Sequence, residues 1–184
     1  MDLKMMIQST PNPNALKFVL NIPVKNEGKA TYKNAASCEH NPLAAALFTI
    51  ANVSEVYFYD NYITVTQDGN VDWDAIEEQI KKIITEYAPN HDANFPFDEG
   101  KKAVLVSDNP DINKINEILD RTIRPALQMD GGDLNVVNLD GHTLYVNYQG
   151  ACGSCPSSTM GTLKAIEGIL KDQFNPEITV EIAA

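Results

Sequence analysis

The stretch Leu134–Pro156 reads LNVVNLDGHTLYVNYQGACGSCP. It contains two runs rich in strand-forming residues, 134–139 and 143–149, and the pair Asp140-Gly141 that separates them favours a tight turn. The second run alternates apolar and polar residues, which is typical of a half-buried strand. The stretch therefore predicts a β-hairpin that leads into a loop with two cysteines.

Helical patterns flank this hairpin on both sides. Apolar residues recur every three or four positions from about Asp111 to Met129, and Asp130-Gly131-Gly132-Asp133 follows as a stop signal. A second helix is predicted over 156–174, and the alternating run 178–182 predicts a last strand. The order helix, two strands, helix, strand indicates a small α+β domain over 108–184.

The first half of the chain also mixes helices and strands. Its patterns predict strands over 3–8, 16–20, 56–59 and 62–66, and helices over 42–51 and 72–87. The segment 89–107 is rich in turn formers, and its apolar run 103–106 fits either a linker or an edge strand. We therefore predict an α+β protein with two small domains, 1–88 and 108–184, joined by the linker 89–107.

Composition excludes several classes of function. The 184 residues carry a formal net charge of −11, and the longest basic runs are Lys81-Lys82 and Lys101-Lys102, so nucleic acid is not expected as a partner. No segment approaches the ~18 apolar residues of a membrane span. The N-terminus, Met1–Met6, reads neither as a signal peptide nor as an Arg-rich transit peptide, and three cysteines make no disulfide framework. We expect a cytoplasmic protein that does not bind membranes.

Cys152 and Cys155 are the candidate functional residues. Their spacing lets both sulfurs reach one soft metal centre, and the only other cysteine, Cys38, is far away in sequence. The pair lies between a strand and a helix start, where unpaired N–H groups and the helix dipole stabilise thiolates. Gly150 and Gly153 allow the backbone to approach the sulfurs closely.

Spacing alone leaves four interpretations open. The pair is half of an iron–sulfur site that a second chain completes, a dithiol–disulfide redox pair, half of a structural zinc site, or two buried thiols without a role. Ala151 occupies the position before the motif where redox proteins usually have an aromatic residue. Outside this loop, Cys38-Glu39-His40 is expected to be a loop or surface element and His91 to be solvated. Asp130 and Asp133 are expected to serve their turn through local backbone hydrogen bonds.

Two separated motifs resemble a known family. Residues 127–134, then a hairpin, then 150–160 and an amphipathic helix are similar to the C-terminal domain of NifU, the Nfu domain, over about 108–184. The first half resembles the Nfu N-terminal domain through three segments, 10–18, 53–58 and 61–65. Together the two resemblances cover most of the chain.

The resemblance implies a scaffold or carrier, and not an enzyme, that delivers iron–sulfur clusters to apo iron–sulfur acceptor proteins. It implies that Cys152 and Cys155 bind a [4Fe-4S] cluster between the two subunits of a cluster-bridged homodimer. A [2Fe-2S] cluster remains an alternative because it takes the same four thiolates. A thiol–disulfide oxidoreductase that uses the same cysteines is the alternative function.

Overall fold

The computed structural model describes residues 2–38, 40–97, 109–153 and 156–183. The chain forms two compact units, Met1–Phe97 and Asp98–Ala184, and each combines helices with a β-sheet. This confirms the predicted fold class of two α+β domains. The apolar run 103–106, which fitted either a linker or an edge strand, lies outside the described residues.

The first unit is built on a five-stranded antiparallel sheet with the order β1-β2-β5-β4-β3. The strands are β1 (Met5–Ser9), β2 (Ala15–Leu20), β3 (Lys25–Tyr32), β4 (Val53–Asp60) and β5 (Tyr62–Gln67). Sequence patterns did not predict β3, because its first half is polar, contains Gly28 and shifts register against β4. Such irregularity is tolerated at the edge of a sheet, where only one side of a strand must be paired.

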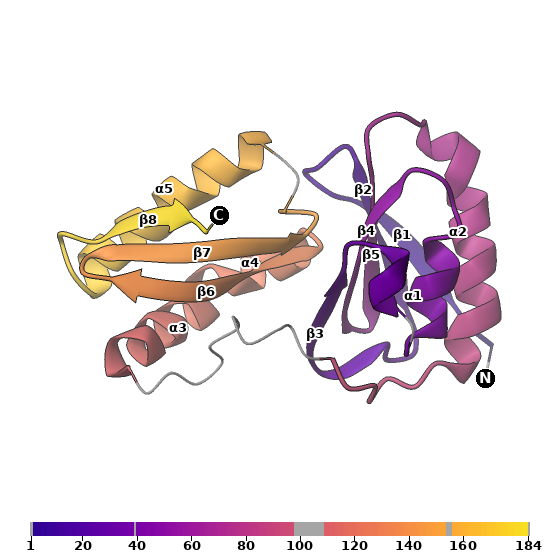
Figure 1. The fold of residues 1–184 in the computed structure, drawn as a ribbon, viewed down its shortest axis with the longest axis horizontal. Coiled ribbons are helices and arrows are strands. Elements are labelled where there is room, and N and C mark those ends of the chain that lie inside the picture. The colour runs from indigo at the N-terminus through magenta and orange to yellow at the C-terminus, as the bar shows by residue number, and fades with distance from the viewer. Residues whose placement is uncertain (1, 39, 98–108, 154–155, 184) are drawn as a thin grey trace. The chain divides into compact units, whose positions relative to one another are not determined.

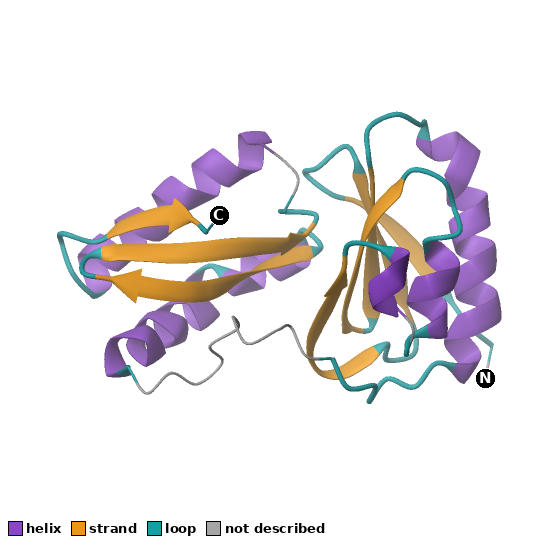
Figure 2. Cartoon of the chain, viewed as in Figure 1, coloured by secondary structure: helices purple, strands orange, loops and turns teal. Residues whose placement is uncertain are grey.

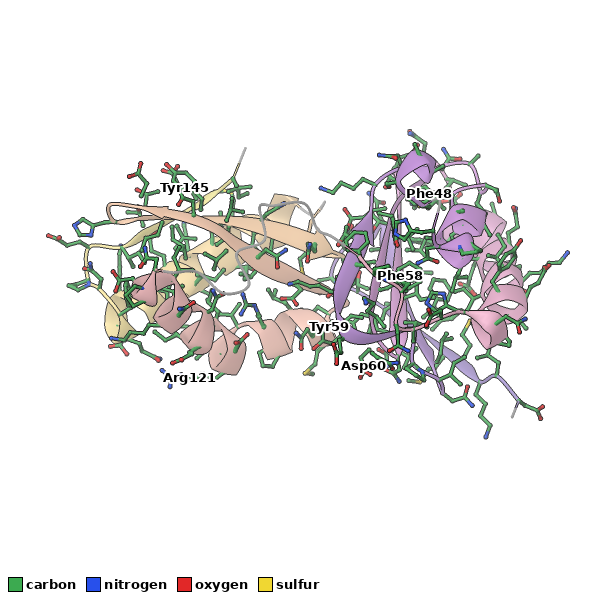
Figure 3. The ribbon with its side chains drawn as sticks, turned by 60° about the horizontal axis from the view of Figure 1, so that its bottom comes forward. Phe48, Phe58, Tyr59, Asp60, Arg121 and Tyr145 are labelled. Carbon is green, nitrogen blue, oxygen red and sulfur yellow. The ribbon has the colours of Figure 1, made fainter. Side chains whose placement is uncertain are left out.

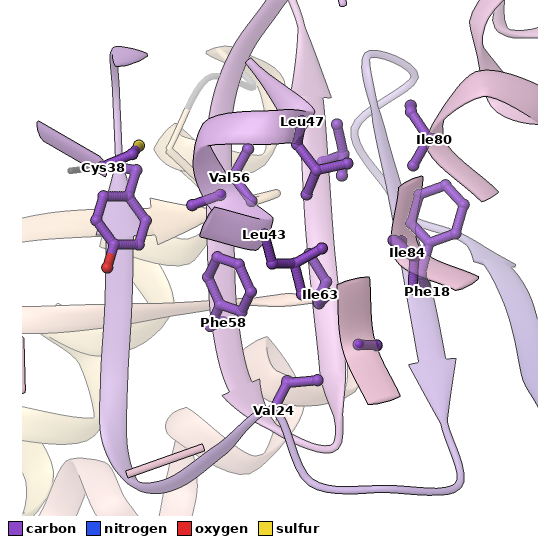
Figure 4. Close-up of a cluster of buried hydrophobic side chains, with 14 of the residues drawn as sticks. Phe18, Val24, Cys38, Leu43, Leu47, Val56, Phe58, Ile63, Ile80 and Ile84 are labelled. Atoms are coloured by element: carbon purple, nitrogen blue, oxygen red, sulfur yellow. The ribbon is translucent and has the colours of Figure 1, made fainter. Parts of the chain in front are cut away.

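Two helices, α1 (Pro42–Leu47) and α2 (Trp73–Tyr87), lie side by side over one face of this sheet (Figure 1). Apolar residues of both helices join those of the strands in one core, and Figure 4 shows Leu43, Ile80 and Phe58 within it. Helix α1 is shorter than the predicted 42–51. The backbone N–H and hydroxyl of Thr49 both bond to the carbonyl of Ala46, which replaces the α-helical hydrogen bond at that point.

The second unit has a three-stranded sheet with the order β6-β7-β8 (Figure 2). Its elements are α3 (Pro110–Thr122), α4 (Arg124–Met129), β6 (Gly132–Asp140), β7 (Thr143–Gly150), α5 (Pro156–Gln173) and β8 (Thr179–Ile182). The predicted hairpin is present as the antiparallel pair β6–β7, and β8 runs parallel to β7 after the α5 crossover. Alternate residues of β7 pack with apolar residues of α3 and α5 in a second core.

The single helix predicted over 111–129 is wrong. The structure has two helices, α3 and α4, that part at Ile123, and Pro125 lies in the first turn of α4. Proline has no N–H to donate and its ring clashes with the carbonyl four residues earlier, so a continuous helix is broken here. None of the helices that the structure describes is both long and apolar enough to cross a membrane.

Candidate functional site

The cysteine loop begins where β7 ends. Gly150, the last residue of β7, has φ +62°, a conformation that side-chain-bearing residues rarely adopt. The chain then turns tightly, since the N–H of Gly153 donates to the Gly150 carbonyl at 3.0 Å and that of Ala151 donates to the Gly131 carbonyl at 3.2 Å. These bonds fix the backbone on both sides of Cys152.

The absence of a side chain at Gly132 leaves room for the Cys152 side chain. In the β6–β7 pairing, Gly132 lies opposite Gly150. A Cβ atom placed on Gly132 would come within 2.7 Å of the Cys152 Sγ, 2.9 Å of the Cys152 nitrogen and 2.6 Å of the Gln149 carbonyl oxygen. All three distances are far below van der Waals contact, so only glycine fits here. The glycine pair that ends the preceding helix therefore forms one wall of a cradle for a sulfur ligand.

Cys152 packs with the core of the second unit and is only 8% exposed. Beside it, Tyr148 is buried, and its hydroxyl has no hydrogen-bond partner among the residues that the structure describes. Burial, and then the nearby Cys152 sulfur, raise the pKa of Tyr148 above its usual range. The tyrosine therefore keeps its proton at neutral pH and stays available as a donor next to the sulfur.

The other half of the pair, Cys155, lies outside the described residues, so its place in the site stays a prediction. Helix α5 begins at Pro156, one residue further on, as the sequence indicated. Within the described parts of the chain, no group of three or more His, Cys, Asp or Glu side chains could hold a metal ion. Among the described residues, the candidate metal ligand is therefore the Cys152 sulfur. A soft sulfur ligand suits iron or zinc rather than magnesium or calcium.

An ion-pair network that sequence patterns did not predict holds Asp133, the residue that follows Gly132. Asp133 is 2% exposed, accepts a hydrogen bond from its neighbour Leu134 at 2.7 Å, and lies 3.7 Å from the Nε of Arg124. Arg124 also pairs with Asp120 and donates to the Asn116 side chain at 2.7 Å. The expected local role of Asp133 is thus present, and the arginine adds a link from α3 and α4 to β6.

An Arg124→Met variant is expected to destabilise the second unit by about 3 kcal/mol, because it leaves the buried Asp133 carboxylate without its cation. Urea titration that follows the amide NMR signals of β6 and β7 measures this effect. Fluorescence of Trp73, the only tryptophan, follows unfolding of the first unit, and its transition should not change.

The matched control is Arg121→Met. Arg121 is exposed at the surface (Figure 3) and bonds only to Gln173 among the described residues, so about 0.5 kcal/mol is expected. Equal losses for both variants would contradict a buried ion pair.

Two residues of the first unit are more buried than expected, although His40, the last of the triplet, is exposed in a turn as expected. Cys38 is not a surface residue: it is fully buried in the core at the end of the 3-10 helix η1 (Ala35–Cys38), as Figure 4 shows. Burial raises the pKa of its thiol, and its Sγ donates to the Asn34 carbonyl at 3.3 Å. His91 is half-buried rather than solvated, and its ring stacks on Phe58. Glu39, between Cys38 and His40, lies outside the described residues.

The fold and the loop together define a two-domain protein whose second domain presents a thiol ligand between a β-hairpin and a helix. Comparison with known families identifies both parts. Residues 5–91 match the family described as "Scaffold protein Nfu/NifU N terminal", and residues 115–181 match the "NifU-like domain". The chain therefore belongs to the NifU-like, or Nfu, family of proteins.

Curated relatives agree with this assignment. The chain is 33% identical over 169 residues to NifU-like protein 5, mitochondrial, of Arabidopsis thaliana, a match that covers 89% of this chain and 62% of the relative. It is 30% identical over 177 residues to the NFU1 iron-sulfur cluster scaffold homolog, mitochondrial, of Drosophila willistoni, which covers 93% and 60%. The chain thus spans about three fifths of these relatives. A solved NifU-like protein from Saccharomyces cerevisiae is 24% identical and covers 48% of this chain and 80% of its own, but a TM-score of 0.44 adds nothing to the assignment.

The names of these relatives contradict the expected cytoplasmic location. NifU-like protein 5 of Arabidopsis thaliana and the scaffold homolog of Drosophila willistoni are both named as mitochondrial, and so is NifU-like protein 4 of Arabidopsis thaliana. The expectation depended on the first six residues, which do not read as a signal peptide or a transit peptide. Because the relatives are longer than the region matched here, those residues do not report on location, and the expectation is withdrawn.

Proposed function

We propose that this protein is a scaffold or carrier for iron–sulfur clusters, with the cluster as its cargo and Cys152 and Cys155 as its ligands. The observation that supports this best is the glycine cradle at Cys152, where a side chain on Gly132 would collide with the sulfur. The names of the NFU1 relatives describe iron–sulfur cluster scaffolds. We keep 108–184 as the proposed cluster-binding domain, but extend the first domain from the predicted 1–88 to 1–97, because Phe95 is buried in its core, which shortens the proposed linker from 89–107 to 98–107.

The proposed site is completed by a second copy of the chain. Iron–sulfur clusters of the [4Fe-4S] and [2Fe-2S] types take four thiolates, and one loop supplies two. Two large apolar side chains near the loop are exposed, Met129 at 77% and Met160 at 66%. Met129 precedes Gly131, whose carbonyl accepts from Ala151 in the loop. Methionine adapts to different surfaces, which suits contact with a second copy and then with varied acceptors. We propose a cluster-bridged homodimer with [4Fe-4S] as its cargo.

Release in this proposal is ligand exchange. A thiolate of an apo acceptor protein forms a bond to a cluster iron as a scaffold thiolate leaves that iron, and the step repeats until the acceptor holds the cluster. Every iron keeps four sulfur ligands before and after each step, and no electron is gained or lost. Because the protein binds and releases its cargo unchanged, we propose a carrier and not an enzyme. A site shared between two chains opens when they separate, which makes stepwise exchange possible.

Anaerobic reconstitution of the full chain with iron and sulfide tests the proposal. We expect a brown protein that absorbs near 400 nm and elutes as a dimer, with roughly four irons and four sulfides per dimer. Roughly two of each would instead indicate a [2Fe-2S] cargo. Zinc without sulfide would contradict the proposal in favour of a structural zinc site. A colourless protein that reduces disulfides catalytically would contradict it in favour of the oxidoreductase.

A further inference from the structure

The first unit contains a surface cavity of about 610 Å³ that the proposed function does not use. It lies between the start of α1, the end of α2 and the 3-10 helix η2 (Ala88–Asn90) that follows. Its volume is typical of a site for a small ligand. Its lining includes His40, Asn41, Glu86, Tyr87, His91 and Asp92.

The first histidine of the lining, His40, lies beside the buried side chain of Tyr32. The Asn41 Nδ2 donates to the Tyr32 hydroxyl at 3.3 Å, while the Asn41 Oδ1 caps α1 by accepting from the Ala44 N–H. Burial raises the pKa of Tyr32 to about 12, so the hydroxyl keeps its proton. The same hydroxyl and the Nε2 of His40 lie within hydrogen-bond distance, 3.3 Å apart.

The second histidine of the lining, His91, is oriented by a backbone carbonyl. The Nε2 of His91 donates to the Val24 carbonyl at 2.8 Å, because a carbonyl can only accept. Burial lowers the pKa of His91, and the hydrogen bond to Val24 offsets this only in part. The ring is therefore uncharged at neutral pH and its Nδ1 is an acceptor. His91 therefore supplies no positive charge to the cavity.

The charged groups of the lining are carboxylates, those of Glu86 and Asp92. None of the lining residues that the structure describes is a lysine or an arginine. The ammonium of Lys25 donates to the Phe95 carbonyl at 2.9 Å and sits 4.6 Å from the centre of that ring. The Asp92 carboxylate accepts from the Asn94 N–H, and no hydrogen bond or ion pair of Glu86 is present among the described residues. The two side chains of the lining that carry a full charge at neutral pH are therefore both negative.

We propose that this cavity binds the guanidinium group of an arginine side chain presented by a partner protein. A guanidinium is planar, donates five hydrogen bonds in a fixed fork that fits carboxylates, and stacks on aromatic rings. The two carboxylates supply the acceptors, and Tyr87, which is 36% exposed at the rim, supplies the ring. A protein segment is the source that fits, because most of the lining residues are exposed and the cavity opens at the surface.

Titration of the full chain with Nα-acetyl-arginine amide, followed by amide NMR, tests this proposal. We expect shifts concentrated at Asn90, His91 and Asp92. A Glu86→Gln/Asp92→Asn variant should bind at least roughly tenfold more weakly, as expected when hydrogen bonds to charged groups are lost. Asparagine at 92 can still accept from Asn94, so the fold should remain. The matched control Glu27→Gln removes an exposed charge of the same unit outside the cavity and should leave binding unchanged.

Two further probes can overturn the proposal. Nα-acetyl-citrulline amide has the same shape without the charge, and equal shifts with it would exclude recognition of a guanidinium. Equal affinity for Nα-acetyl-lysine amide would replace the guanidinium with any cation. Shifts that spread over the acidic surface and persist in the double variant would mean that the cavity is not the site. None of these measurements involves iron, so they can fail while the proposed cluster site stands.

Discussion

A Cys152→Ser variant is expected to lose nearly all of its cluster after anaerobic reconstitution, from roughly four irons per dimer to almost none. Serine keeps the size of the side chain close to that of cysteine, but its hydroxyl is a hard ligand that does not replace a thiolate on iron. Because each loop supplies two of four ligands, one substitution removes two ligands from every dimer. Iron and sulfide content and the absorbance near 400 nm measure the loss.

Cys38→Ser is the matched control, because Cys38 is the third cysteine and lies in the core of the other unit. Its Sγ donates to the Asn34 carbonyl, and a serine hydroxyl can make the same bond. This variant should reconstitute like the unchanged protein. Dispersed amide NMR spectra should show that both variants are folded. A folded Cys152→Ser variant with normal iron and sulfide would exclude Cys152 as a cluster ligand.

The second unit could be predicted from sequence because its signals are local. The alternation in β7 and the turn at Asp140-Gly141 fix the hairpin, and the apolar period fixes α5. Proline at 125 was visible but the strong apolar period on both sides masked the break between α3 and α4. Strand β3 gave no signal, since an edge strand held mainly by its neighbour β4 needs no apolar alternation of its own.

The candidate site was predictable only in part. The spacing of Cys152 and Cys155 identifies a pair of ligands from the sequence alone. The role of Gly132 depends on its register opposite Gly150, a pairing that exists only once the hairpin has formed. The contact between Arg124 and Asp133 likewise requires α4 to pack on β6. Glycine and arginine occur in many structural contexts, so the residue type alone does not predict these tertiary contacts.

Gly132→Ala is the substitution that tests the cradle itself. The new Cβ would lie 2.6 Å and 2.9 Å from two backbone atoms, one of them the Cys152 nitrogen, and 2.7 Å from the Cys152 sulfur, and backbone atoms cannot give way by a side-chain rotation. The loop must therefore move, and Cys152 moves with it. We expect the second unit to lose about 1–3 kcal/mol, the range for overpacking a tight site, and cluster uptake to fall well below that of the unchanged protein. Urea titration that follows the β6 and β7 amides measures the first effect, and iron content the second.

The matched control for this test is Gly168→Ala in α5, where an added Cβ meets nothing within 4 Å. Alanine in a helix is more favourable than glycine by up to about 1 kcal/mol, so this variant should gain stability and keep its cluster. The two changes are chemically the same, and only the surroundings of the new methyl group differ. If Gly132→Ala also reconstituted fully and lost no stability, the contact between Gly132 and Cys152 would not shape the site. A loss of cluster with little loss of stability would instead place the effect in the position of the Cys152 sulfur.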